Sequence, residues 1–181
     1  MSKLDETINL IGKFIEKHKC NKNISIKFIL GKYTEVFGFE KNLFHEENYS
    51  KIMNLLESCK SWEEVAEEID EQFIDEPEKI VDSMILSYIG SPYDFVIVAQ
   101  TTKNTRVFKS ETYVENSIHY TRKNHTYSLY NDNEQNFRFE LNLILDPKIN
   151  NVYLAHSSIL KLNDVINCCG KISDKYTLKK I

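Results

Sequence analysis

Apolar residues in the first half of the chain recur mainly with the spacing of helices. Near the N-terminus they stand three or four positions apart and predict one helix, with Leu4, Ile8, Ile11 and Ile15 on its apolar face. Residues 46–59 carry a second such stripe and predict a second helix. Between them, residues 24–30 are rich in β-branched residues and end at Gly31, so one short strand is expected there.

Two acidic helices are predicted to follow. Residues 61–64 (Ser-Trp-Glu-Glu) resemble a capping box, and an apolar helical face continues through residues 65–73. A further helix is expected to start near Asp75, because Pro77 suits a first helical turn, and to stop at Gly90. Its buried side would hold Ile80, Val81, Met84, Ile85 and Tyr88.

The pattern changes to that of strands after Pro92. Residues 93–99 form a nearly continuous apolar run that is typical of a central strand. Along residues 137–145, Phe and Leu alternate with polar residues, which is the clearest period-two pattern in the chain. Further strands are predicted at 105–114, 117–122 and 125–130. Short polar turns join several of these segments, and this favours antiparallel pairing.

The sequence therefore predicts an α+β fold, with N-terminal helices packed on an antiparallel meander or partial β-barrel. Its 181 residues suit one domain, residues 1–91 being mainly helical and residues 92–181 mainly antiparallel strands. No apolar run reaches the roughly 20 residues of a membrane-spanning helix, and the N-terminus lacks the pattern of a signal peptide. A soluble, cytoplasmic protein without membrane partners is expected.

Acidic residues are concentrated in one segment. Residues 46–82 hold 13 Asp or Glu and 3 Lys, whereas the whole chain has a net charge of −4. Carboxylates that follow one another on a helix without intervening cations repel each other. They form either a solvated face or a surface that steers a basic partner protein. The expected partner-binding residues are Glu63, Glu64, Glu67, Glu68 and Glu71.

Two His-x-Ser/Thr units suggest a catalytic alternative. They resemble the paired motifs of two-histidine phosphodiesterases, in which each His moves a proton and each hydroxyl holds the phosphate. The residues of such a site would be His119, Thr121, His156 and Ser158. His156 also shares the two-residue spacing of apolar positions 152, 154, 160 and 162, which would make it a core histidine of a strand.

Residues 24–32 resemble the first strand of the tunnel-fold RNA triphosphatases, the triphosphate tunnel metalloenzymes of fungal and large-virus capping systems. The loop and helix of residues 39–56 have the layout of that family, and residues 118–127 and 137–141 resemble its basic tunnel strands. The resemblance implies that Arg122, Lys123 and Arg138 face the phosphates.

The chain departs from this family where the family binds metal. Ser25 and Lys27 stand where the resemblance implies metal-binding glutamates, and the last paired-acid strand is absent near residues 152–155. Magnesium and manganese need hard oxygen ligands, and a lysine at that position repels the ion. We therefore expect no metal and no cofactor.

Three classes of function stay open. The main expectation is a non-catalytic interaction protein, such as a viral accessory subunit or an immunity or inhibitor protein, that docks a partner through its acidic helices. The first alternative is a tunnel-fold triphosphatase, or a degenerate relative that still binds polyphosphate or RNA 5′ ends. The second alternative is the two-histidine phosphodiesterase.

Overall fold

The computed structural model describes residues 3–21, 24–41, 46–59, 62–65, 80–88, 93–101, 116–131, 137–169 and 178–180. The helices in these ranges are α1 (Lys3–Lys19), α2 (Glu46–Ser58) and α3 (Asn151–Cys169). The strands are β1 (Ile24–Thr34), β2 (Gly38–Glu40), β3 (Glu63–Val65), β4 (Ile80–Tyr88), β5 (Asp94–Thr101), β6 (Asn116–Arg122), β7 (His125–Asn131), β8 (Phe137–Leu143) and β9 (Leu178–Lys180). None of the described helices is both long and apolar enough to cross a membrane.

All of the described strands join one antiparallel sheet. Its order is β3-β6-β7-β8-β1-β5-β4-β9, and β2 pairs with β1 as a short hairpin. The strand β1 therefore lies in the middle of the sheet, between β8 and β5. Among the described strands, β3 and β9 stand at the two ends of this order, so the sheet is open and not a closed barrel. The predicted α+β fold with an antiparallel sheet is confirmed.

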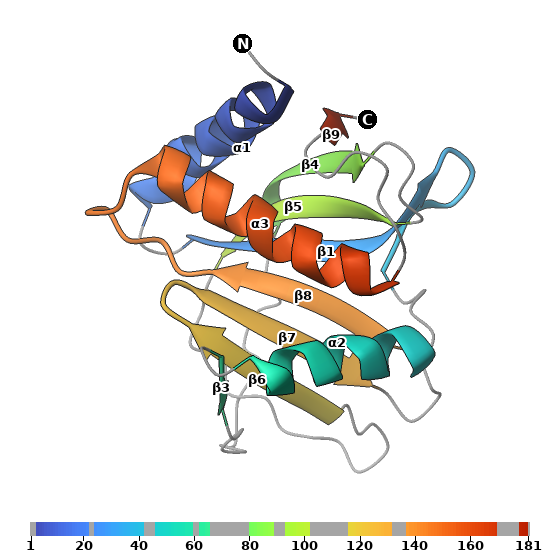
Figure 1. Cartoon of the computed structure of the whole chain (residues 1–181). Helices are drawn as coiled ribbons and strands as arrows, with labels where there is room; N and C mark the ends of the chain where they lie inside the picture. Colours follow the sequence, from blue (N-terminus) through green and yellow to red (C-terminus); the bar gives the residue numbers. More distant parts are fainter. Residues whose placement is uncertain are drawn as a thin grey trace.

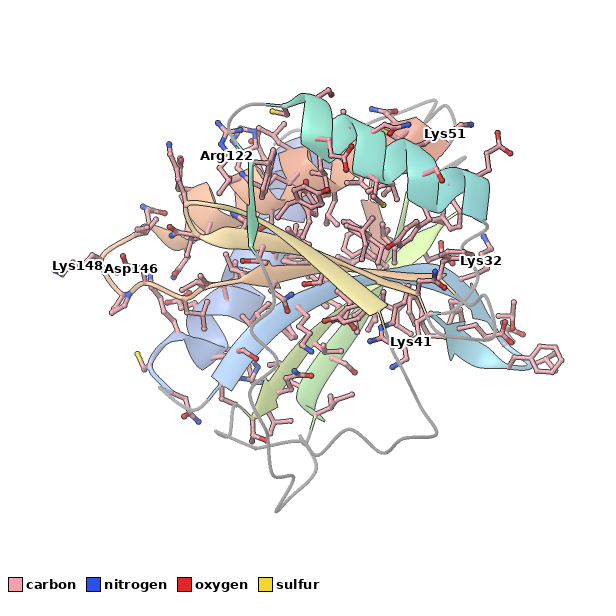
Figure 2. The ribbon with its side chains drawn as sticks, turned by 90° about the horizontal axis from the view of Figure 1, so that it is seen from below. Lys32, Lys41, Lys51, Arg122, Asp146 and Lys148 are labelled. Carbon is pink, nitrogen blue, oxygen red and sulfur yellow. The ribbon has the colours of Figure 1, made fainter. Side chains whose placement is uncertain are left out.

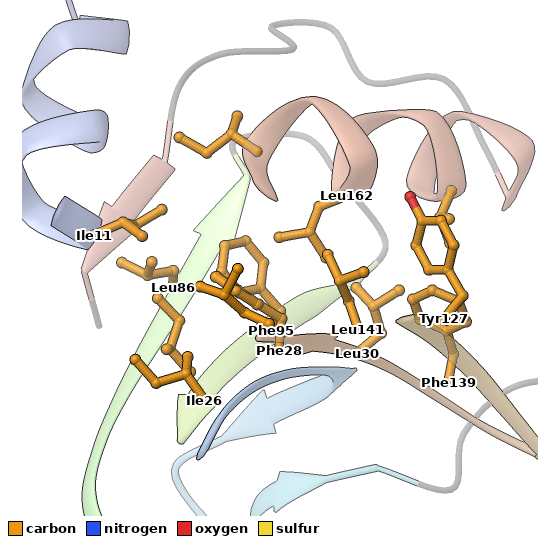
Figure 3. Packing of buried hydrophobic residues seen from close by; sticks show 14 of the residues in the cluster. Ile11, Ile26, Phe28, Leu30, Leu86, Phe95, Tyr127, Phe139, Leu141 and Leu162 are labelled. Carbon is orange, nitrogen blue, oxygen red and sulfur yellow. The ribbon is translucent and has the colours of Figure 1, made fainter. Parts of the chain in front are cut away.

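The helices cover one face of this sheet, and α3 crosses over β5, β1 and β8 (Figure 1). Successive side chains of a strand point to opposite faces, so alternate residues of β1 and β8 reach this covered face. There they meet Ile11 of α1, Leu56 of α2 and Leu162 of α3 in one apolar core (Figure 3). The alternation predicted for residues 137–145 is confirmed, because Phe137, Phe139, Leu141 and Leu143 are buried and Leu145 packs against the core.

Two segments that were predicted as helical are strands. Residues 63–65 form β3, which pairs with β6, and residues 80–88 form β4, which pairs with the buried strand β5. Ile80 and Val81, predicted to be buried, are 62% and 50% exposed. In β4, backbone pairing along β5 outweighs the helical spacing of a short apolar run. Residues 66–79 and the strand predicted at 105–114 lie outside the described residues.

Residues 152–162, whose alternation predicted a strand, belong to helix α3. A half-buried strand would bury all the apolar residues of that spacing, but Val152 and Leu160 are 52% and 41% exposed. The residues that are buried instead follow helical spacing: Leu154, Ala155, Ser158, Ile159 and Leu162. Asn150 caps this helix, since its side-chain oxygen accepts a hydrogen bond from the Val152 N–H at 2.8 Å. A long helix thus lies in the half that was predicted to be mainly strands.

The strand β1 continues through Gly31, where the sequence predicted its end. A Cβ atom on Gly31 would lie 2.1 Å from the carbonyl oxygen of Glu40 and 2.8 Å from the ring of Phe39. Both of these neighbours belong to β2, which pairs with β1 just beyond Gly31. The glycine is therefore needed for the close approach of β2, and not for a turn.

Candidate functional site

The sheet face away from the helices carries polar side chains at its centre. The alternation that buries the phenylalanines of β1 and β8 under the helices turns their polar neighbours to the other side. Residues directly opposite each other in antiparallel strands share a face. In β7, Tyr130 lies opposite Arg138 and Ser128 lies opposite Glu140, so both belong to this face. We call the resulting group the polar face: Lys27, Ser128, Tyr130, Arg138 and Glu140.

Glu140 holds two cations on the polar face. Its side chain is 5% exposed; one carboxylate oxygen lies 3.6 Å from Lys27 Nζ, and the other lies 3.1 Å from Arg138 Nε. The Arg138 guanidinium also lies 4.1 Å from the centre of the Tyr130 ring, as a cation–π contact. The side chains of Lys27 and Arg138 are 20% and 18% exposed. Two positive charges thus face one buried negative charge, and solvent reaches both cations.

The donors of the polar face do not fit a divalent metal ion. Magnesium and manganese take several oxygen ligands, whereas both oxygens of Glu140 already face cations. The ammonium of Lys27 would repel a divalent ion placed beside this carboxylate. Within the described ranges, no group of three or more His, Cys, Asp or Glu side chains could hold a metal ion.

The three cations that the resemblance groups together lie in two places. Arg138 belongs to the polar face, whereas Arg122 and Lys123 lie at the turn between β6 and β7, beside α3 (Figure 2 labels Arg122). A cavity of about 420 Å³ opens between this turn and α3. Its polar lining includes Arg122, Lys123, His125, His156, Lys161 and Asp164. We call it the turn cavity.

Lys161 is a residue of the turn cavity that the sequence reasoning missed. It lies four residues after Ser157 on α3, and its Nζ donates a hydrogen bond to the Ser157 hydroxyl at 2.7 Å. Burial lowers the pKa of Lys161, and the positive charges of Arg122 and Lys123 lower it further. The helical spacing of buried residues in α3 would have indicated it, whereas the alternation at positions 152–162 predicts a strand.

His125, one of the residues that line this cavity, forms a buried hydrogen bond with Ser158. His125 Nε2 lies 2.8 Å from the Ser158 hydroxyl oxygen, and the same hydroxyl donates to the Leu154 carbonyl oxygen at 2.8 Å. Since the Ser158 proton is used on Leu154, the hydroxyl oxygen accepts from His125 Nε2–H, which defines the tautomer of His125. Burial lowers the pKa of His125 to about 3, with a smaller contribution from the charge of Lys161. His125 is therefore neutral at physiological pH.

The residues of the expected two-histidine site do not all lie in the described part of the chain. His156 is exposed at the turn cavity, and Ser158 is buried below it in its bond with His125. The side chains of His119 and Thr121 in β6 lie outside the described residues. The hydroxyl of Ser158 is thus already paired within the fold, and the phosphodiesterase hypothesis stays a prediction.

The acidic partner-binding residues are described only in part. The backbones of Glu63 and Glu64 belong to β3, which replaces the start of the predicted acidic helix. Their side chains, and all of Glu67, Glu68 and Glu71, lie outside the described residues. Docking of a basic partner at these residues stays a prediction.

Comparisons with known proteins bear on the fold. The sequence matches no protein-family model and no curated protein sequence. Among solved structures, the S. pombe RNA triphosphatase Pct1 in complex with the Spt5 CTD matches with a TM-score of 0.57 and 10% identity, over 88% of this chain and 85% of that chain. Pct1 in the structure described without the CTD matches with a TM-score of 0.53 and 10% identity, over 88% of this chain and 84% of that chain. The chain therefore has a fold similar to that of the tunnel-fold enzyme Pct1, and the resemblance found in the sequence is confirmed at the level of the fold.

Proposed function

We propose that this chain is a relative of the tunnel-fold triphosphatases that binds phosphate-rich polyanions, such as RNA 5′ ends, on its polar face without hydrolysing them. The observation that carries the proposal is the contact between Lys27 and Glu140, 3.6 Å apart, at the centre of a sheet whose fold resembles that of an RNA triphosphatase. The similarity in fold to an RNA triphosphatase favours this function over docking of a basic partner through acidic helices.

The chemistry of the polar face supports binding of phosphates. A divalent ion neutralises phosphate oxygens in enzymes that use one, and here Lys27 brings a positive charge to the strand where the family places metal ligands. Arg138 adds a planar guanidinium, which suits phosphate oxygens. Tyr130 and Glu140 hold this guanidinium in place from two sides. The cations are thus positioned before any ligand arrives, which lowers the entropic cost of binding.

The same arrangement argues against hydrolysis. Cleavage of a triphosphate requires stabilisation of the charge that develops on the transferred phosphoryl group and positioning of a water nucleophile. Glu140 is the carboxylate that lies between the two cations of this face, and Lys27 and Arg138 engage both of its oxygens. Binding without turnover is the function that these contacts favour.

The proposal is tested by fluorescence anisotropy with a labelled RNA oligonucleotide carrying either a 5′ triphosphate or a 5′ hydroxyl. In EDTA we expect the triphosphate form to bind about tenfold more tightly, since a charge-assisted hydrogen bond contributes about 1.5–3 kcal/mol. Replacing Lys27 with Gln should remove most of this preference. The matched control, Lys51→Gln, changes an exposed lysine of α2 (Figure 2) and should leave the preference intact.

A phosphate-release assay with manganese completes the test. We expect no release above background from nucleoside triphosphates or triphosphate RNA. Metal-dependent release, or RNA binding that ignores the 5′ triphosphate, would contradict the proposal. The thermal midpoint of Lys27→Gln must be compared with that of the original protein, so that a loss of binding is not confused with unfolding.

A further inference from the structure

We propose that the turn cavity is a second anion site, separate from the polar face, which binds the phosphate group of a small phosphomonoester. It lies between the β6–β7 turn and α3, on the side of the sheet that the helices cover, whereas the polar face lies on the other side. The proposed RNA-binding function makes no use of this cavity, so the two sites can be tested independently.

Three cations meet at the turn cavity. Arg122 and Lys123 come from the β6–β7 turn and are exposed, and Lys161 reaches the same space from α3. Asp164 is the acidic residue of the cavity lining, so positive charges outnumber negative ones there. A guanidinium offers two parallel N–H donors to a phosphate, and two ammonium groups add point charges around it. This is the chemistry that recognises a phosphate dianion.

In the protein without ligand, the positive charges of Arg122 and Lys123 act unfavourably on the Lys161 ammonium in the turn cavity. The pKa of Lys161 is lowered by its burial and by the charges of Arg122 and Lys123, and Asp164 offsets this only in part. The hydrogen bond to Ser157 holds the Lys161 ammonium against α3. A bound phosphate would relieve the repulsion among the three cations, so binding of a dianion is favoured more than at an isolated lysine.

The backbone of the turn fixes the position of one of these cations. Lys123 has a φ angle of +51°, which makes it the non-glycine residue with left-handed backbone among those described. An L-residue in this region costs about 1–2 kcal/mol, and Gly avoids the cost. The residue at this position, which favours glycine, is a lysine, and it is one of the residues that line the cavity. The two-residue loop between the paired residues Arg122 and His125 requires this backbone conformation, so the hairpin itself fixes where the lysine lies.

The cavity also has an apolar side, which indicates the rest of the ligand. Ile149, Leu154 and Leu160 line it together with Tyr153, and Leu160 and Tyr153 are 41% and 55% exposed. A volume of about 420 Å³ falls in the range of small-molecule sites. A ligand with one phosphate and one ring would place the phosphate on the cations and the ring against Tyr153 and Leu160. The ligand class is therefore a phosphomonoester with an organic ring, for which AMP is a suitable probe.

Isothermal titration calorimetry with AMP, adenosine and inorganic phosphate tests this site. We expect AMP to bind at least about tenfold more tightly than adenosine, because only AMP reaches the cations. Lys123→Gly should weaken AMP binding about tenfold while its thermal midpoint stays the same or rises, since the change removes the charge and the backbone strain together. Lys51→Gly is unsuitable as a control because it lies inside a helix, so Lys51→Ala serves instead.

Two outcomes would overturn the inference. One is equal affinity for AMP and adenosine. The other is AMP affinity that Lys123→Gly leaves unchanged; if Lys27→Gln then abolishes it, AMP binds on the polar face. Conversely, a Lys27→Gln protein that has lost its preference for triphosphate RNA should still bind AMP normally. A failure of the proposed RNA function is thereby distinguished from a failure of this second site.

Discussion

Replacing Glu140 with glutamine should make the protein less stable and a tighter binder of polyanions. The change keeps the shape of the side chain and removes its charge, so Lys27 and Arg138 would face each other without their shared counterion. Removing one partner of a fully buried ion pair costs about 3–5 kcal/mol. Because about a fifth of each cation's side chain is exposed here, we expect a smaller loss of about 2–3 kcal/mol. For a chain of this length that lowers the thermal midpoint by roughly 5–10 °C.

The affinity of Glu140→Gln for triphosphate RNA should rise, although its stability falls. A carboxylate about 4 Å from a bound phosphate oxygen repels it by about 1 kcal/mol even in a water-like environment. Without this repulsion, triphosphate RNA should bind Glu140→Gln roughly fivefold more tightly in EDTA. A structural ion pair unrelated to binding would lose stability without any gain in affinity, and the combination of both effects is therefore diagnostic.

Urea unfolding followed by tryptophan fluorescence measures the loss of stability. The single tryptophan, Trp62, has its ring 4.4 Å from that of Tyr127, so its emission reports on the fold. Glu47→Gln is the matched control, because the Glu47 side chain is 79% exposed and its loss should change stability by no more than about 0.5 kcal/mol. If Glu140→Gln behaves like Glu47→Gln in both stability and RNA affinity, the assignment of the polar face is refuted.

Two further changes test other parts of the structure. Gly31→Ala would place a Cβ atom 2.1 Å from the Glu40 carbonyl oxygen, so it should separate β2 from β1 and destabilise the protein by about 1–3 kcal/mol; unchanged hydrogen exchange of the β2 amides would contradict this. His125 has a folded-state pKa of about 3, below the value near 6.5 of an unfolded chain, so its contribution is complete above pH 6.5 and is lost as the pH falls toward 3. Between these values the original protein should lose about 1.4 kcal/mol per pH unit more than His125→Gln, and parallel stability curves for the two proteins would show that His125 titrates normally.

Local spacing predicted the elements in which one face alone is buried. The helices α1 and α2 and the strands β1 and β8 were expected near their observed positions from their apolar residues, whereas β5, which is buried on both faces, was expected from its continuous apolar run. In β4 the residues assigned to a buried helical face include two, Ile80 and Val81, that are exposed. In α3, apolar residues at positions 152, 154, 160 and 162 show the two-residue spacing of a strand, but Val152 and Leu160 are exposed. Short apolar runs do not distinguish the two periods when exposed apolar residues interrupt them.

The candidate site could be predicted only as a set of residue types. The resemblance selected Arg122, Lys123 and Arg138 as cations, but the long-range register of the sheet places Arg138 beside Lys27 and Glu140. The turn cavity depends on α3 lying beside the β6–β7 turn, which is a tertiary contact that no local pattern contains. Only the folded structure therefore identifies Lys161 as a residue of the turn cavity.

The central place of β1 has a consequence for how the chain folds as it is synthesised. This strand is made early, yet it pairs with β8 through residues such as Ile29 and Glu140, which are 111 positions apart. At about 5–20 residues per second, the ribosome needs roughly 6–22 s to complete that partner. Both hydrogen-bonding edges of this apolar strand lack their final neighbours until β5 is made, since Ile29 pairs with Val96, 67 positions later. The edge that pairs with β8 stays open for the whole interval, and an open edge of this kind is the condition under which nascent chains aggregate or recruit chaperones. We therefore expect slow folding with high contact order, and expression yields that depend strongly on temperature and on the supply of chaperones.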